Sequence, residues 1–184
     1  QKFIEDGKLV IGICNGFQVL VKMGILPNLK GDWTPQVTLI HNDSGKFEDR
    51  WVKLRFNPES RCVWTKGMTE LDCPVRHGEG KFVTADENIL KILRDKNLIS
   101  SIYSGEESTG FNPEEEVPYP ENPNGSVLNI AGICDETGRV FGMMPHPEAF
   151  LYAQNHPLWR RQEISTTGLV IFRNAVNYAE NKLL

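Results

Sequence analysis

One cysteine of this chain stands in a setting that could make it a nucleophile. Cys14 lies between Gly12 and Gly16, in the order G-x-C-x-G, after an apolar run at 8–13 and before a helical pattern. A sharp turn between a strand and a helix is the nucleophile elbow, where flanking glycines remove clashes. The helix N-terminus would favour the thiolate, and the Asn15 N–H could stabilise an oxyanion. The alternative is a buried structural cysteine in a tight turn.

A thiol nucleophile needs a base, and the base needs a residue that orients it. His146 lies between two prolines just after an expected strand, and Glu148 follows two residues later. Prolines favour extended backbone, in which residues i and i+2 project to the same side. His146 is therefore a candidate base, and Glu148 could hold its imidazole and stabilise the charged form. The alternative is an ordinary proline-rich loop with a surface histidine.

His77 is a rival for the role of base. It also has an acid two residues later, Glu79, and glycines at 78 and 80 indicate a sharp bend or a close approach to a ligand. A plain glycine-rich turn explains the same pattern. His41 and His156 have no such setting, and we interpret both as surface or internally satisfied histidines.

The rest of the chain must position these side chains. Strands are expected near 8–13, 36–40, 51–56, 81–84, 98–103, 128–134 and 140–144. Helices are expected from about 16, after the N-cap Asp86, and over 168–182. The predicted apolar stripe of the last helix comprises Leu169, Phe172, Val176, Ala179 and Leu183. We expect one domain over 1–184.

Residues 104–126 break this pattern. They include six Glu and four Pro but no Lys or Arg. A long acidic loop of this kind is usually functional or mobile, which makes it a candidate docking or gating element. The alternative is a solvated insertion with no specific role.

Composition excludes several classes of function. The net charge is 20 − 24 = −4, which gives no reason to expect nucleic-acid binding. No apolar run approaches the ~20 residues needed to span a bilayer, and no secretory signal is recognisable. The four cysteines form no C-x-x-C pair, so we expect no metal site and reduced thiols in a cytoplasmic protein.

Together, these motifs resemble the class I (triad) glutamine amidotransferases. In that family a G-x-C-x-G-x-Q elbow is followed far downstream by H-P-E, here 12–18 and 146–148. The stretches His-Gly-Glu-Gly at 77–80 and Asn-Pro-Asn-Gly-Ser at 122–126 are similar to the glutaminases that belong to phosphoribosylformylglycinamidine synthases of purine biosynthesis.

The resemblance implies a three-layer, flavodoxin-like α/β fold, with a central, mostly parallel sheet and helices on both faces. It implies Cys14, His146 and Glu148 as the catalytic triad. It places Asn15, Gly16, Gln18 and His77 on the substrate side of the site. The implied substrate is L-glutamine. The implied partners are a synthetase subunit and a small accessory subunit. No cofactor is implied in this chain, because ATP and Mg²⁺ belong to the synthetase, and no P-loop is present here.

The family has two further strands before the elbow and a Gly-Gly loop that donates a second oxyanion N–H. This sequence starts one helix before the elbow strand, so we expect it to be N-terminally truncated relative to the family. Two other functions remain open from the sequence. One is another triad hydrolase, such as a γ-glutamyl hydrolase or an intracellular cysteine peptidase. The other is a binding subunit without turnover.

Overall fold

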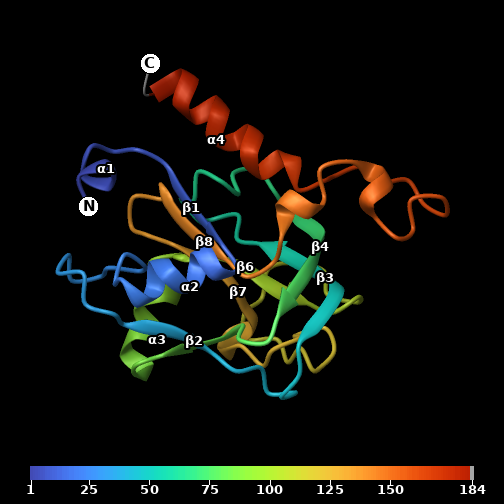
Figure 1. Ribbon diagram of the computed structural model, residues 1–184, viewed down its shortest axis with the longest axis horizontal. Coiled ribbons are helices and arrows are strands. Elements are labelled where there is room, and N and C mark those ends of the chain that lie inside the picture. The colour runs from blue at the N-terminus through green and yellow to red at the C-terminus, as the bar shows by residue number, and fades with distance from the viewer. Residues whose placement is uncertain (183–184) are drawn as a thin grey trace.

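A mixed six-stranded sheet forms the centre of the protein, for which a computed structural model describes residues 1–182 (Figure 1). The strands in spatial order are β1 (Val10–Ile13), β8 (Val140–Met143), β7 (Ile130–Cys134), β6 (Ile99–Ser104), β3 (Glu48–Phe56) and β4 (Glu70–His77). A second, two-stranded sheet pairs β2 (Val37–Ile40) with β5 (Lys81–Thr84). This is the α/β class that the sequence predicts.

The pairing of the strands differs from the expected one. Only β1 and β8 run parallel, and the other four pairings of the large sheet are antiparallel. A mostly parallel sheet is therefore wrong for the strands described. The physical reason is visible at β7 and β8, which a turn at 135–139 joins, since so short a connection permits only antiparallel neighbours.

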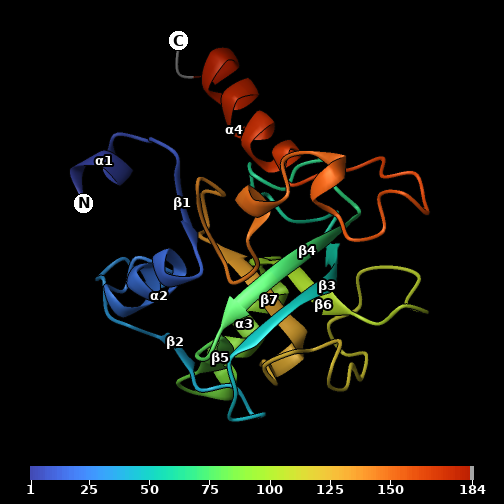
Figure 2. The same ribbon diagram turned by 45° about the vertical axis from the view of Figure 1, so that its right-hand side comes forward.

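The helices lie around this sheet. They are α1 (Lys2–Glu5), α2 (Asn15–Lys22), α3 (Glu87–Asp95) and α4 (Leu169–Lys182). Helix α2 packs against β1, β8 and β2, and α3 packs against β5. Figures 1 and 2 both show α4 at the top of the molecule, separated from α2 by β1 and β8. Short 3₁₀ turns occupy Val127–Asn129, Pro147–Ala149 and Ala153–Asn155.

Two of the predicted helices have the expected local causes. Asp86 caps α3, because its carboxylate accepts a hydrogen bond from the Ile89 N–H at 2.9 Å. Helix α2 buries Phe17, Leu20 and Val21, the face predicted from the sequence. These contacts hold the helix that follows Cys14 firmly on the sheet.

The buried face of α4 is not the predicted one. Ile171 and Ala175 are buried, whereas Val176 is 55% exposed. The side chain of Asn174 donates to the carbonyls of Trp64 and Lys66, at 3.0 and 2.9 Å, and these bonds turn that side of the helix inward. The predicted stripe was therefore rotated, and its last member, Leu183, lies outside the described residues.

Strand β4 was not predicted from the sequence. Pro74 lies within it, and prolines are excluded from central strands because they cannot donate to the ladder. β4 is an edge strand, paired only with β3, so Pro74 is tolerated opposite Trp51. The buried side chains of Leu71, Cys73 and Val75 alternate along it, as expected for an edge strand with one face on the core.

The acidic segment between β6 and the 3₁₀ turn at 127 contains no helix or strand. Lys53 pairs with Glu106, and Arg94 pairs with Glu114, which ties it to the body of the protein. Its end is buried through Asn122, Asn124 and Ser126, which bond to one another. The role of this loop stays a prediction, as does the single-domain organisation.

The buried apolar side chains form one continuous cluster that includes residues from α2, α4 and five strands of the large sheet, and the partly buried side chains of β1 pack against it. Within residues 1–182, no helix is both long enough and apolar enough to cross a membrane.

Candidate active site

Cys14 is the junction between β1 and α2. Its φ of 50° lies in the left-handed region, which a residue with a side chain adopts only at some cost. A Cβ at Gly12 would come within 2.6 Å of the Gly16 backbone, so glycine is required there. At Gly16 itself, a Cβ would meet nothing within 4 Å outside its own helix. The elbow therefore depends on Gly12, and the steric role predicted for Gly16 is wrong.

The Cys14 backbone is fixed by the neighbouring strand and by its own helix. Its N–H donates to the Met143 carbonyl at the end of β8, at 2.8 Å. Its carbonyl accepts the first helical hydrogen bond, from Gln18 at 3.1 Å. The side chain is partly exposed, and its sulfur lies 3.7 Å from the Arg76 carbonyl in β4. Two strands at different places in the sheet thus converge on the cysteine.

His146 and Glu148 form the expected pair, but the extended backbone predicted for this segment is wrong, because a 3₁₀ turn at Pro147–Ala149 brings the two side chains together. The Nδ1 of His146 lies 2.6 Å from a Glu148 carboxylate oxygen, and the His146 N–H donates to the Pro74 carbonyl at 2.8 Å. The Nε2 atom is buried and makes no hydrogen bond of normal geometry within the described residues. With Nδ1 held by Glu148, Nε2 is the nitrogen that remains free to exchange a proton.

The charge state of His146 reflects its neighbours. The nearby Cys14 sulfur is the largest cause of a pKa of His146 that is raised to about 9, and the Glu148 carboxylate adds to it. Burial opposes this shift, because it disfavours the charged imidazolium. The imidazolium is therefore the favoured form at neutral pH, as in a cysteine–histidine pair prepared for nucleophilic attack.

His77 has the opposite environment. It is 3% exposed, and burial is the main cause of a pKa lowered to about 4. Its Nδ1 lies 3.2 Å from the Asn42 side-chain oxygen, and Gly80 packs directly against its ring. Glu79 does not reach it and instead lies 3.6 Å from His41. His77 is thus neutral and fixed in the turn at 77–80.

The other sequence-predicted site residues lie around the elbow. The Gln18 side chain donates to the Glu79 carbonyl at 2.8 Å, which joins α2 to the turn at 77–80. Asn15 is the first residue of α2, so its N–H has no partner within the helix. Gly16 is exposed. The structure therefore brings Gln18 and the His77 turn together, while Asn15 and Gly16 line the start of the helix.

Sequence reasoning missed Asn42, which organises this turn. Its amide donates to the His77 and Lys46 carbonyls, at 2.8 and 2.9 Å, and its oxygen accepts from the Gly80 N–H at 2.9 Å. An asparagine two residues after an expected strand was the one available signal. Nothing local in the sequence indicated that it is buried.

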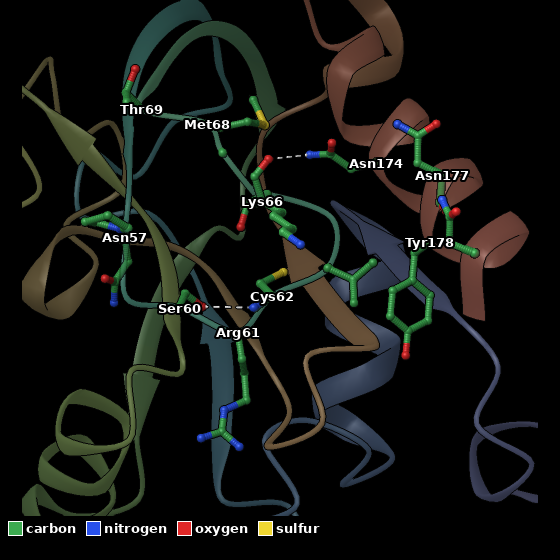
Figure 3. Close-up of a pocket in the computed structure, with 15 residues that line it drawn as sticks. Asn57, Ser60, Arg61, Cys62, Lys66, Met68, Thr69, Asn174, Asn177 and Tyr178 are labelled. Carbon is green, nitrogen blue, oxygen red and sulfur yellow. Dashed lines mark hydrogen bonds between the residues drawn. The ribbon is translucent and has the colours of Figure 1, made fainter. Parts of the chain in front are cut away.

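A large cavity lies elsewhere. It has a volume of about 970 Å³ and separates the connection at 57–69 from α4 (Figure 3). Cys62, Lys66 and Tyr178 are among its lining residues, and no member of the Cys14 site is. Size alone does not identify a reaction site, and this cavity contains no nucleophile paired with a base. All four cysteines are free, and no group of metal-ligating side chains occurs within the described part of the chain.

The model of the CobB/CobQ-like glutamine amidotransferase domain matches residues 1–179. The chain belongs to this family.

Individual relatives point in the same direction. The chain is 46% identical to "Phosphoribosylformylglycinamidine synthase subunit PurQ" of Dehalococcoides mccartyi, over 97% of this chain and 67% of that protein. It is 39% identical to the protein of the same name from Treponema denticola, over 97% and 69%. A solved structure, "Structure of PurLQS from Thermotoga maritima", has a TM-score of 0.66 and 29% identity over 96% of this chain and 65% of that one. The chain thus spans about two thirds of the length of these relatives.

Proposed function

We propose that this amidotransferase chain is the glutaminase component of phosphoribosylformylglycinamidine synthase. It hydrolyses L-glutamine to glutamate and ammonia, and the ammonia passes to a synthetase subunit in purine biosynthesis. The observation that carries the proposal is the convergence of Cys14, His146 and Glu148 in a chain whose relatives bear that name. The same names favour this function over a γ-glutamyl hydrolase, a peptidase or a subunit without turnover.

The first half of the reaction releases ammonia. Transfer of the Cys14 proton to His146 gives the imidazolium–thiolate pair, and the thiolate attacks the carboxamide carbon of glutamine. The oxyanion is stabilised by backbone N–H groups, of which Asn15 supplies one. The imidazolium protonates the amide nitrogen, the carbon–nitrogen bond breaks, and ammonia leaves behind a γ-glutamyl thioester on Cys14.

The second half restores the enzyme. His146 removes a proton from water, which attacks the thioester carbon. Glutamate departs as the carbon–sulfur bond breaks, and Cys14 regains its proton. Glu148 keeps the imidazole in the tautomer that both halves need, as the aspartate does in a serine triad. Gln18 and His77 hold the turn at 77–80 in place, and the proposal assigns this turn to the side of the site that binds glutamine.

The need for a synthetase partner follows from the chemistry of ammonia. Ammonia released into water at neutral pH becomes protonated and loses its nucleophilicity, so a synthetase must receive it directly. ATP and Mg²⁺ act on that synthetase, and a small accessory subunit completes the cytoplasmic assembly. Docking or gating by residues 104–126 belongs to the same proposal.

The test replaces the nucleophile. In the full-length protein assembled with its synthetase, Cys14→Ala should abolish glutamine-dependent synthesis and leave ammonia-dependent synthesis intact. A diazoketone analogue of glutamine should label Cys14, but not the buried Cys62. Retention of glutamine hydrolysis by Cys14→Ala contradicts the assignment of the nucleophile. A rate of hydrolysis that is indifferent to the synthetase contradicts the assignment as a synthase component.

A further inference from the structure

The segment at 151–163 projects from the body of the protein. It connects the 3₁₀ turn that carries Glu148 to helix α4, and Figures 1 and 2 both show it extending beyond the sheet. We refer to residues 151–163 as the projecting segment. Its only regular element is the short turn at Ala153–Asn155.

The base of the projecting segment is fixed by His156. This side chain is buried, and its Nε2 lies 3.4 Å from a carboxylate oxygen of Asp72 in β4. Its ring meets the ring of Trp51 edge-on, with centroids 4.7 Å apart, and its Nδ1 accepts a hydrogen bond from the Leu158 N–H. The segment is therefore held in one arrangement rather than left to be ordered on binding, which lowers the entropic cost of association.

The outer side of the projecting segment is apolar and cationic. Tyr152 is 67% exposed, Trp159 is 42% exposed, and Leu158 is exposed beside them. The Arg160 guanidinium lies 4.9 Å from the centroid of the Trp159 ring, and Arg161 is also exposed. Tryptophan, tyrosine and arginine are the residues that dominate binding energy in protein–protein interfaces.

This surface lies near the reaction site, as β4 shows. Asp72 holds the projecting segment, the Pro74 carbonyl holds His146, and the Arg76 carbonyl meets the Cys14 sulfur. A strand rises ~3.3 Å per residue, so the four residues from 72 to 76 span about 13 Å. A protein bound to the projecting segment would thus also overlie the mouth of the site.

We propose that the projecting segment is a docking element for the synthetase, in addition to any role of residues 104–126. The matching surface on the synthetase is an apolar pocket for Trp159 edged by carboxylates that pair with Arg160 and Arg161. This inference rests on the proposed function, because it explains how released ammonia is kept from water. The positive charge of this segment within a chain of net charge −4 gives the contact its orientation.

The test compares two double variants in the full-length protein. Trp159→Ala/Arg160→Glu removes the aromatic anchor and inverts one charge. The matched control, Val176→Ala/Arg173→Glu, makes the same kinds of change at exposed positions of α4. The first variant should weaken binding to the synthetase at least tenfold, and the control should change it less than twofold. Thermal unfolding of both variants should match that of the parent, because all four side chains are exposed.

Catalysis provides the second readout. Glutamine-dependent synthesis should fall at subsaturating synthetase, whereas ammonia-dependent synthesis by the synthetase should not change. Binding of the parent should weaken as salt is raised, and Arg160→Gln/Arg161→Gln should bind with a smaller salt dependence. Unchanged binding by the Trp159 variant, or an equal loss in the control, overturns the docking site. Neither result touches the role of Cys14, which the Cys14→Ala variant tests separately.

Discussion

His146 and His77 share a local pattern but differ in their electrostatics. Each is a histidine followed two residues later by a glutamate. At 146–148, Glu148 turns back onto the imidazole, and the pKa of His146 is raised to about 9. At 77–79, the imidazole is buried away from its glutamate, and the pKa of His77 is lowered to about 4.

The difference comes from the residue that separates each histidine from its glutamate, and from the groups that surround each imidazole. Pro147 opens a 3₁₀ turn that directs Glu148 toward the ring. Gly78 instead lets the chain bend so that the Glu79 carbonyl meets Gln18 and its carboxylate points to His41. Spacing alone therefore does not make a catalytic pair. A histidine becomes a base when a carboxylate and a nucleophile both meet it, and it becomes a structural group when burial dominates.

The strongest test of the difference between His146 and His77 is to remove each imidazole in turn. His146→Asn should lower the rate of glutamine hydrolysis about 10⁴-fold, because the proton transfers of both half-reactions depend on it. His77→Asn should lower the rate far less, since its ring takes no part in proton transfer. Steady-state kinetics of the full-length protein with its synthetase measure both. Equal losses in the two variants would show that the assignment of the base is incomplete.

Neutralising each carboxylate in turn distinguishes the role of Glu148 from that of Glu79. Glu148→Gln keeps an acceptor near the His146 Nδ1 but removes the charge, so the rate should fall about 10²- to 10³-fold. The pKa of His146 should fall as well. Glu79→Gln should leave the rate and the pKa of His77 almost unchanged, because that carboxylate does not contact the ring. Rate profiles against pH for the two variants provide the check, and a large effect of Glu79→Gln would contradict it.

Stability against pH should distinguish the two histidines by sign. His77 titrates near 6.5 when unfolded and near 4 when folded, so the unfolded state binds more protons between these values. Acidification from pH 6.5 to 4.5 should therefore cost about 2 to 3 kcal/mol through His77. His146 acts in reverse: its contribution is present below pH 6.5 and is lost as the pH rises toward 9.

Urea unfolding of the parent and His77→Gln at several pH values measures the His77 contribution. The difference between the two proteins should shrink as the pH falls from 6.5 to 4.5. A difference that stays constant over this range would show that His77 is not buried in its neutral form.

The smallest expected effect concerns the glycines of the His77 turn. A Cβ at Gly80 would come within 2.4 Å of the His77 ring, so Gly80→Ala should cost about 1 to 3 kcal/mol. Gly78→Ala is the matched control, because its Cβ would meet only Phe47, at 4.0 Å. Unfolding free energies of the two variants decide this, and a larger loss at Gly78 would count against the packing described for His77.

Much of the site could be predicted from the sequence, because its chemistry is encoded locally. The elbow needs a glycine at position 12, a strand before Cys14 and a helix after it, and all of these are visible as short patterns. The order His-Pro-Glu likewise fixes the geometry of its own side chains. Cys14 and His146 are far apart along the chain, and only the resemblance to a family predicted that they belong to one site. Spacing alone does not show that β8 and β1 are neighbours.

What could not be predicted depends on contacts across the fold. Strand β4 was missed because Pro74 is tolerated only at an edge, and being an edge strand is a property of the sheet. The buried face of α4 was misjudged because Asn174 bonds to the carbonyls of Trp64 and Lys66. The opposite pKa shifts of His77 and His146 follow from burial and from neighbours that no local window contains.

The central claim is that Cys14 and Glu148 make His146, and not His77, the charged base of this site. NMR titration of the isotopically labelled histidines of the full-length protein tests it most directly. We predict that His146 titrates near 9 and His77 near 4, and that Cys14→Ala lowers the pKa of His146 while leaving that of His77 almost unchanged. A His146 pKa at or below its ordinary value of 6.5, or one that Cys14→Ala does not move, would contradict the account.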